Sequence, residues 1–179
     1  MLATIKERMP PREQNLLVFA VCAFPIFAWS IISALRQIPS WSLQFDLWEL
    51  LSMFAYTQVF ALLESAIIFG LLWLAAVLLP GRILRERLVA KSALVMLAAT
   101  VWFIYLHLND NFIRAREFLP LALWAGSLLL ALTVGFILVH RSARVRQSIH
   151  AIVERLAVLS AIYVAIGVIS VVIVAIRNV

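Results

Sequence analysis

Residues 156–176 read LAVLSAIYVAIGVISVVIVAI, an apolar run in which no residue is charged. A transmembrane helix needs about 20 predominantly apolar residues to cross a hydrocarbon core of ~30 Å. Backbone N–H and C=O groups within lipid must be paired inside the segment, and the run lacks the alternating pattern of a barrel strand. The run therefore predicts a helix that spans a membrane.

Four further apolar stretches precede this one, at residues 16–35, 58–79, 92–108 and 119–139. Of the 179 residues of the chain, 65% are hydrophobic and 13% are charged, whereas an average soluble domain has about 25% charged residues. The mean hydropathy is +1.04. We therefore expect an all-α integral membrane protein, a bundle of five transmembrane helices that forms one domain over residues 1–179. The expected location is the cell membrane, either plasma or inner.

The orientation in the membrane follows from the positively charged residues. Most of the 15 Lys and Arg residues fall in the N-terminal arm and in the second and fourth connections. These are Lys6, Arg8, Arg12, Arg82, Arg85, Arg87, Lys91, Arg141, Arg144, Arg146 and Arg155. Because short cationic loops stay in the cytoplasm, we expect the N-terminus inside, and an odd number of spans then places the C-terminus outside. This positive-inside distribution explains the net charge of +6 without a nucleic-acid partner.

The arginines of the two cytoplasmic connections have a second expected role. Cations near the surface attract anionic lipid head groups, each contributing about 1 kcal/mol. We expect such contacts from Arg82, Arg85, Arg87, Arg141, Arg144 and Arg146. We expect no metal or cofactor, because His107 and His140 fall at opposite membrane faces and Cys22 is the single cysteine.

The segment of about residues 40–56 precedes the second span and is amphipathic. Ser42, Asp46, Glu49 and Tyr56 share one helical face, and aromatic and aliphatic side chains surround that face. We expect an amphipathic helix in the outer interface, or a helix that continues directly into the second span. A substrate or partner groove formed by the same aromatic residues is the alternative.

Glu64 is the one charged residue within the five apolar stretches. A carboxylate in the hydrocarbon region costs about 2.5 to 3.5 kcal/mol on insertion scales, so it should face protein or water, or be protonated. Two hypotheses follow. Glu64 is either an acid that handles protons or a ligand, or a helix-packing carboxyl group that is hydrogen-bonded to a neighbouring span.

Polar residues at the outer end of the third span extend this candidate site to His107, Asp110 and Arg114. Histidine changes charge near neutral pH, so His107 could exchange protons there. The spacing matches no metal-binding motif, and general acid–base catalysis would need a nucleophile that the sequence does not identify. An ordinary interface histidine is the simpler interpretation.

Two functional hypotheses remain, and the first of them is non-catalytic. The first is an accessory or assembly subunit of a larger membrane complex, because the loops are short and much apolar surface is available for contact with other membrane subunits. The second is a small transporter or lipid-handling protein with an outward-facing polar site around Glu64, His107 and Asp110. The absence of a recognisable nucleophile, metal or cofactor motif makes an enzyme the third choice.

Overall fold

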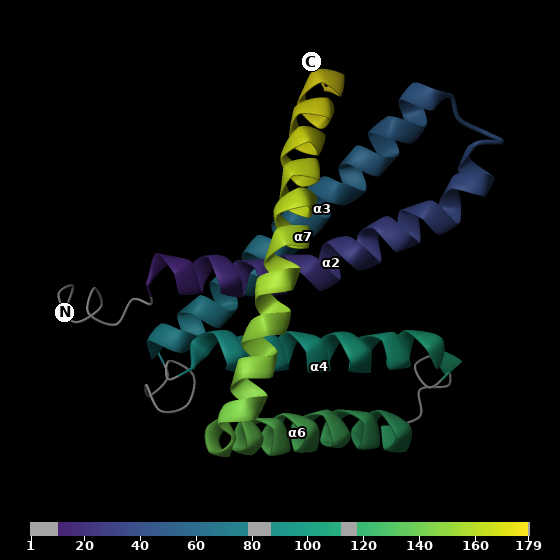
Figure 1. The fold of residues 1–179 in the computed structure, drawn as a ribbon. Coiled ribbons are helices and arrows are strands. Elements are labelled where there is room, and N and C mark those ends of the chain that lie inside the picture. The colour runs from purple at the N-terminus through teal and green to yellow at the C-terminus, as the bar shows by residue number, and fades with distance from the viewer. Residues whose placement is uncertain (1–10, 79–86, 112–117, 179) are drawn as a thin grey trace.

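The fold is described from a computed structural model, which covers residues 11–78, 87–111 and 118–178. These residues are mainly helical and include no strand. The helices are α2 (Arg12–Trp41), α3 (Leu47–Leu78), α4 (Leu88–Leu108), α6 (Phe118–Arg141) and α7 (Ala143–Arg177) (Figure 1). Within the covered ranges, all 5 are long and apolar enough to cross a membrane. The expectation of an all-helical chain with five candidate membrane spans is confirmed.

Several helices extend beyond the apolar stretches that predict them. Helix α3 has 32 residues and α7 has 35, which correspond to roughly 48 and 52 Å at the rise of an α-helix. The added part of α7 is its polar beginning, where Ser142 caps the helix by accepting a hydrogen bond from the Val145 N–H at 3.4 Å. Helical turns continue outside the predicted apolar stretches because backbone pairing and capping do not depend on hydropathy.

The segment at residues 40–56 does not form a helix of its own. Helix α2 continues to Trp41, a short turn follows, and α3 begins at Leu47. Asp46 and Glu49 cap α3 reciprocally, since the Glu49 N–H donates to Asp46 Oδ1 at 2.8 Å and the Asp46 N–H donates to Glu49 Oε2 at 3.2 Å. The separate amphipathic helix is therefore not confirmed, and residues 47–56 continue directly into the second apolar stretch.

The helices form two hairpins that α7 crosses. Helices α2 and α3 pack together, and α4 and α6 lie side by side below them in Figure 1. Helix α7 packs mainly on α2 and α3 and makes smaller contacts with α4 and α6. Figure 1 shows the α2–α3 hairpin rising away from α4, so the two hairpins are close at one end and apart at the other.

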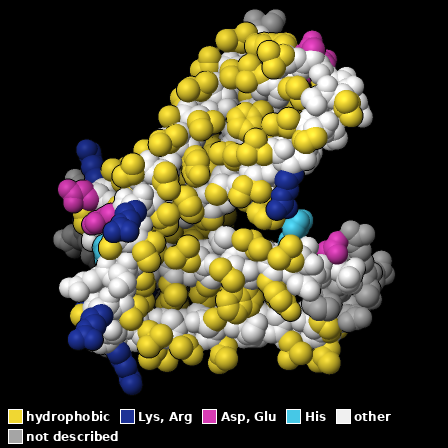
Figure 2. Space-filling view, turned by 45° about the vertical axis from the view of Figure 1, so that its right-hand side comes forward, with side chains coloured by type: hydrophobic (Ala, Val, Ile, Leu, Met, Phe, Trp, Pro, Cys, Tyr) yellow, Lys and Arg dark blue, Asp and Glu magenta, His cyan; other side chains and the backbone are white. Residues whose placement is uncertain are grey.

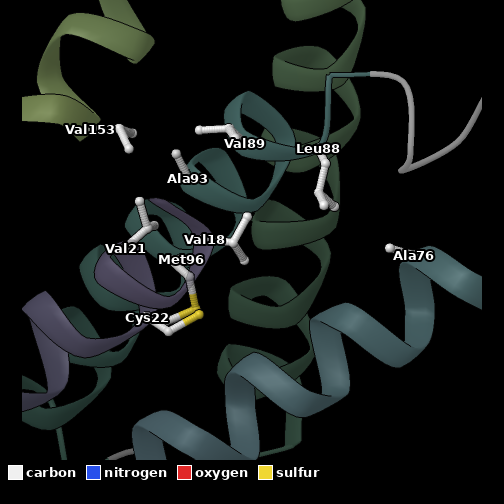
Figure 3. Packing of buried hydrophobic residues seen from close by; sticks show 9 residues of the cluster. All are labelled: Val18, Val21, Cys22, Ala76, Leu88, Val89, Ala93, Met96 and Val153. Atoms are coloured by element: carbon white, nitrogen blue, oxygen red, sulfur yellow. The ribbon is translucent and has the colours of Figure 1, made fainter. Parts of the chain in front are cut away.

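The hairpins are joined by an apolar core at the end where they are close. Val18, Val21 and Cys22 of α2 pack there with residues of α4, including Ala93 and Met96 (Figure 3). Val153 of α7 and Ala76 of α3 complete the cluster. Small side chains, for example Ala76 and Ala93, allow the helices to approach one another closely within this core.

A second cluster connects the middle of α7 to α2 and α3. Phe27, which is fully buried, stacks on Tyr163 of α7 with ring centroids 6.1 Å apart. Gly167 lies against the same phenylalanine, and a Cβ atom at Gly167 would come within 2.9 Å of Phe27 Cζ. Helix α7 can approach α2 at this level because residue 167 has no side chain.

Candidate functional site

A groove of about 930 Å³ lies between α2, α3 and α4. Figure 2 shows this face of the molecule with a deep hollow between its upper and lower parts, and with blue and cyan side chains near the opening. Ligand sites in proteins typically have volumes of about 300–1,000 Å³, are mainly apolar and contain a few placed polar groups. The groove therefore has the size of a small-molecule or lipid-chain site.

The groove exists because α2 and α4 diverge beyond their shared core. Pro25, in the middle of α2, lines the groove, and α2 runs through both Pro25 and Pro39 without a break. Proline within a helix removes one backbone hydrogen bond and bends the helix. Figure 1 shows α2 changing direction along its length, and its second half rises with α3 away from α4.

The lining of the groove changes in polarity from one end to the other. At the end near the shared core the side chains are apolar, for example Ile68 and Leu72 of α3 and Met96 of α4. Towards the opposite end, polar side chains appear on all three helices. They are Ser30, Ser33 and Gln37 of α2, Thr57 and Glu64 of α3, and Thr100 and His107 of α4. The groove is therefore amphipathic along its length.

Several of these polar groups have no hydrogen-bond partner among the described residues. Within the three covered ranges, the side chains of Ser33, Gln37, Glu64 and His107 make no hydrogen bond or ion pair. Polar groups at membrane depth normally find partners, because lipid offers none. These four side chains are therefore available to water or to a bound molecule in the groove.

Trp29 and His107 meet across the groove. Trp29 belongs to α2 and His107 to the last turn of α4, and their rings lie edge to face with centroids 5.1 Å apart and planes at 84°. Both residues line the groove. The contact links the two walls at a level where the helices have otherwise separated.

A small polar network supports the wall between α2 and α3. Gln58 is fully buried, and its Nε2 donates to Ser30 Oγ at 3.2 Å and to Thr57 Oγ1 at 3.3 Å. Ser30 Oγ in turn donates to the Thr57 carbonyl at 3.4 Å. Gln58 Oε1 is buried without a partner among the described residues. Because Ser30 and Thr57 both line the groove, this network fixes their hydroxyl groups at its surface.

The structure brings two of the four site residues predicted from the sequence to one groove. Glu64 and His107 line the same groove, although they lie on different helices. Asp110 follows the end of α4 and is not among the lining residues, and Arg114 lies outside the described residues. The described residues include no group of three or more His, Cys, Asp or Glu side chains that could hold a metal ion.

The six arginines that were predicted to contact lipid head groups have different environments in the structure. Arg82 and Arg85 lie outside the described residues, while Arg141 and Arg144 are exposed. Arg87 instead caps the C-terminus of α6, since its Nη1 donates to the carbonyls of Val139 at 2.9 Å and His140 at 2.6 Å. Arg146 also donates to the Val139 carbonyl, at 3.3 Å. At least two of the six arginines therefore bind backbone carbonyls.

Sequence reasoning missed the α2 wall of the site. Ser30, Ser33, Gln37 and Trp41 recur at helical spacing and share the groove-facing side of α2. That stripe was the available signal. It is ambiguous without the packing, because small polar residues are also common within ordinary transmembrane helices.

Comparisons of the chain with protein-family models, with curated proteins and with solved structures found no match. Assignment of a function to the groove therefore depends on its own residues.

Proposed function

We propose that this protein binds a lipid-like amphiphile in the groove between α2, α3 and α4, and that it is a lipid-handling membrane protein. The observation that supports the proposal is the change of polarity along the groove, from Ile68 and Leu72 at one end to Gln37 and His107 at the other. An amphiphile has the same distribution, with an apolar tail and a polar head. When an amphiphile binds in this orientation, the apolar end of the groove buries its tail and the polar end offers hydrogen bonds to its head.

The proposed orientation places the polar end of the groove in the outer half of a cell membrane, with the N-terminus in the cytoplasm. Described cations gather at one set of helix ends, which include the beginnings of α2, α4 and α7 and the end of α6. They are Arg12, Arg87, Lys91, Arg141, Arg144, Arg146 and Arg155. Figure 1 has these helix ends on the same side of the molecule, which supports the positive-inside orientation.

In this orientation the ligand lies as an outer-leaflet lipid would. Its head is near the ends of α2 and α4, and its tail points along the groove towards the core cluster, which lies at the cationic ends of these helices. Figure 2 shows the hollow open at the molecular surface, which supports lateral entry from the bilayer. The anionic head groups of the cytoplasmic leaflet would then meet the exposed Arg141 and Arg144.

A photoreactive lipid tests the proposal. The protein is incorporated into lipid nanodiscs that contain a phospholipid with a diazirine in its acyl chain, and the labelled peptides are mapped by mass spectrometry. We expect labelling to concentrate on groove residues of α2, α3 and α4, and to fall strongly in Ala99→Trp, which fills the groove. Ala125→Trp, on an exposed part of α6, is the matched control and should label as the unmodified protein does. Labelling that is spread evenly over the apolar surface and unaffected by Ala99→Trp would contradict the proposal.

A second candidate is the accessory subunit of a membrane complex, and α6 is the feature that favours it. Gly135 and Val139 are the buried residues of this helix, and the rest of its surface is at least partly exposed. An apolar helix with so little internal packing has a face available to another membrane protein. Gentle extraction, native electrophoresis and mass spectrometry of co-migrating chains test this candidate, and a solitary monomer would exclude it.

A further inference from the structure

Three of the hydroxyl groups that line the groove donate their protons to backbone carbonyls. Ser30 Oγ donates to the Thr57 carbonyl at 3.4 Å, and Thr57 Oγ1 donates to the Phe54 carbonyl at 2.7 Å. Thr100 Oγ1 donates to the Met96 carbonyl at 2.7 Å. A carbonyl oxygen can only accept, so the hydroxyl group is the donor in each pair. Because a hydroxyl group has a single proton, these three side chains offer only acceptor lone pairs to the groove.

The amide group of Gln58 uses its protons in the same way. Its Nε2 donates to Ser30 Oγ at 3.2 Å and to Thr57 Oγ1 at 3.3 Å, and the side chain is fully buried. The N–H protons of Gln58 and the hydroxyl protons of Ser30 and Thr57 are therefore all used within the protein. Gln58 Oε1 is buried without a partner among the described residues, and a lone pair remains on each hydroxyl oxygen. This network has no proton left to donate, whereas several of its acceptors are unused.

Glu64 and Thr100 extend this set of acceptors to the apolar end of the groove. Glu64 precedes Ile68 by one turn on α3, and Thr100 follows Met96 by one turn on α4, so both lie directly beside the apolar lining. The carboxyl group of Glu64 makes no hydrogen bond or ion pair with a described residue. An ionised carboxylate is an acceptor only. Acceptors therefore line the part of the groove where the head of an amphiphile joins its tail.

A ligand group that meets this part of the wall has to donate hydrogen bonds. Ester, ether and phosphodiester oxygens would bring further acceptors, which form no hydrogen bond with the lone pairs of the wall. A free hydroxyl group supplies a proton, and it can also accept from an N–H group such as that of Gln37, nearer the opening. An ammonium group donates but cannot accept. A hydroxyl group therefore matches the lining more completely.

We propose that the amphiphile in the groove carries free hydroxyl groups next to its tail, as a glycerol or sugar head does. Ser30, Thr57 and Thr100 accept hydrogen bonds from these hydroxyl groups, and Glu64 is a further acceptor. The inference rests on the proposed function, because it specifies the head group of the amphiphile that the groove binds. The requirement for a donor is independent of charge, so the Lys or Arg side chain near the opening in Figure 2 does not oppose it.

Photolabelling with two uncharged competitors tests the proposal. The protein is placed in phosphatidylcholine nanodiscs, whose lipid head has no hydrogen-bond donor, with a dodecylglycerol ether that carries a diazirine in its alkyl chain. The competitors are unlabelled dodecylglycerol ether and the same compound with both hydroxyl groups methylated. We expect the hydroxylated competitor to reduce labelling of groove peptides at a mole fraction about tenfold lower than the methylated one requires. Equal competition would overturn the proposal, and stronger competition by dodecylamine would overturn the assignment of a hydroxyl group.

Valine variants remove the lining hydroxyl groups with little change of shape. The hydrogen bond of Thr100 stays within α4, so Thr100→Val should leave the packing between helices intact and lower the preference for the hydroxylated competitor about threefold. Thr57→Val should lower the preference by a similar factor. Thr133→Val is the matched control, because Thr133 Oγ1 donates to the Leu129 carbonyl at 2.8 Å on α6 and is not among the lining residues. An unchanged preference in Thr57→Val and Thr100→Val would overturn the assignment of these acceptors.

Failure of the head-group inference and failure of the proposed function give different results. If neither the photoreactive glycerol ether nor the photoreactive phospholipid labels residues of the groove, the proposed function fails. If the groove is labelled but the hydroxylated and methylated competitors act equally, the head-group inference alone fails.

Discussion

The indole ring of Trp29 on α2 and the imidazole ring of His107 on α4 meet edge to face, with centroids 5.1 Å apart, and both rings line the groove. The two helices share a core at their other ends but separate towards this level. The ring pair therefore connects the walls of the groove. It also brings an aromatic side chain close to one of the groove's two titratable groups.

The strength of this connection can be measured with a double-mutant cycle. We expect Trp29→Leu and His107→Leu each to lower thermal stability, and the pair to show a coupling free energy of about 0.5–1.5 kcal/mol, which is typical of aromatic pairs. Thermal unfolding in detergent provides the measurement. Trp48→Leu is the control, because Trp48 is exposed and no aromatic contact involves it among the described residues. Additive effects of the two substitutions would show that the ring contact contributes nothing.

Gly167 should not tolerate a larger residue. In Gly167→Ala the new Cβ would lie 2.9 Å from Phe27 Cζ, so either the buried Phe27 ring or α7 must shift. We expect a loss of about 1–3 kcal/mol in the free energy of unfolding, as for other overpacked cores. Gly126→Ala is the matched control, since a Cβ there meets nothing within 4 Å, and alanine should stabilise that helix by up to about 1 kcal/mol. Equal stability of the two variants would contradict the close packing of α7 against Phe27.

Arg87 should stabilise the contact between α4 and α6. Its guanidinium group donates to the carbonyls of Val139 and His140 at the C-terminus of α6, where helix carbonyls lack intrahelical partners, and Arg146 also donates to the Val139 carbonyl. We expect Arg87→Ala to lower the free energy of unfolding by about 1–3 kcal/mol, because hydrogen bonds from charged groups are stronger than neutral ones. Arg144→Ala, an exposed arginine without such bonds, should change stability little.

The backbone conformation of Arg87 lowers the stability of the protein, whereas its side-chain hydrogen bonds raise it. Its φ angle is 68°, in the left-handed region that costs a non-glycine residue roughly 1–2 kcal/mol. Arg87→Gly loses the same hydrogen bonds as Arg87→Ala but relieves this strain. We therefore expect the glycine variant to unfold at a higher temperature than the alanine variant. The reverse order would contradict the left-handed conformation at the start of α4.

The helices could be predicted from the sequence because each contains an apolar run long enough to cross a membrane. The structure of residues 40–56 was harder to predict, because hydropathy does not show where α2 ends and α3 begins. Trp41 still belongs to α2, and Asp46 and Glu49 cap α3. Glu64 was found because a charge within an apolar stretch is conspicuous. The groove itself was not, because Pro25 predicts a bend in α2 but not its direction, and Trp29, Ser33 and Gln37 form a wall only when α2 bends away from α4.

The orientation of the chain can be tested with introduced cysteines. Cys22 is the single cysteine of the sequence and is fully buried, so it should give little background reaction with a maleimide. Ser42→Cys is in the exposed turn between α2 and α3, and Ala143→Cys is at the exposed beginning of α7. If the cationic helix ends face the cytoplasm, a membrane-impermeant maleimide added to whole cells should label Ser42→Cys at once and Ala143→Cys only after permeabilisation. The opposite pattern would place the polar end of the groove in the inner half of the membrane, and a ligand would then enter from the cytoplasmic leaflet.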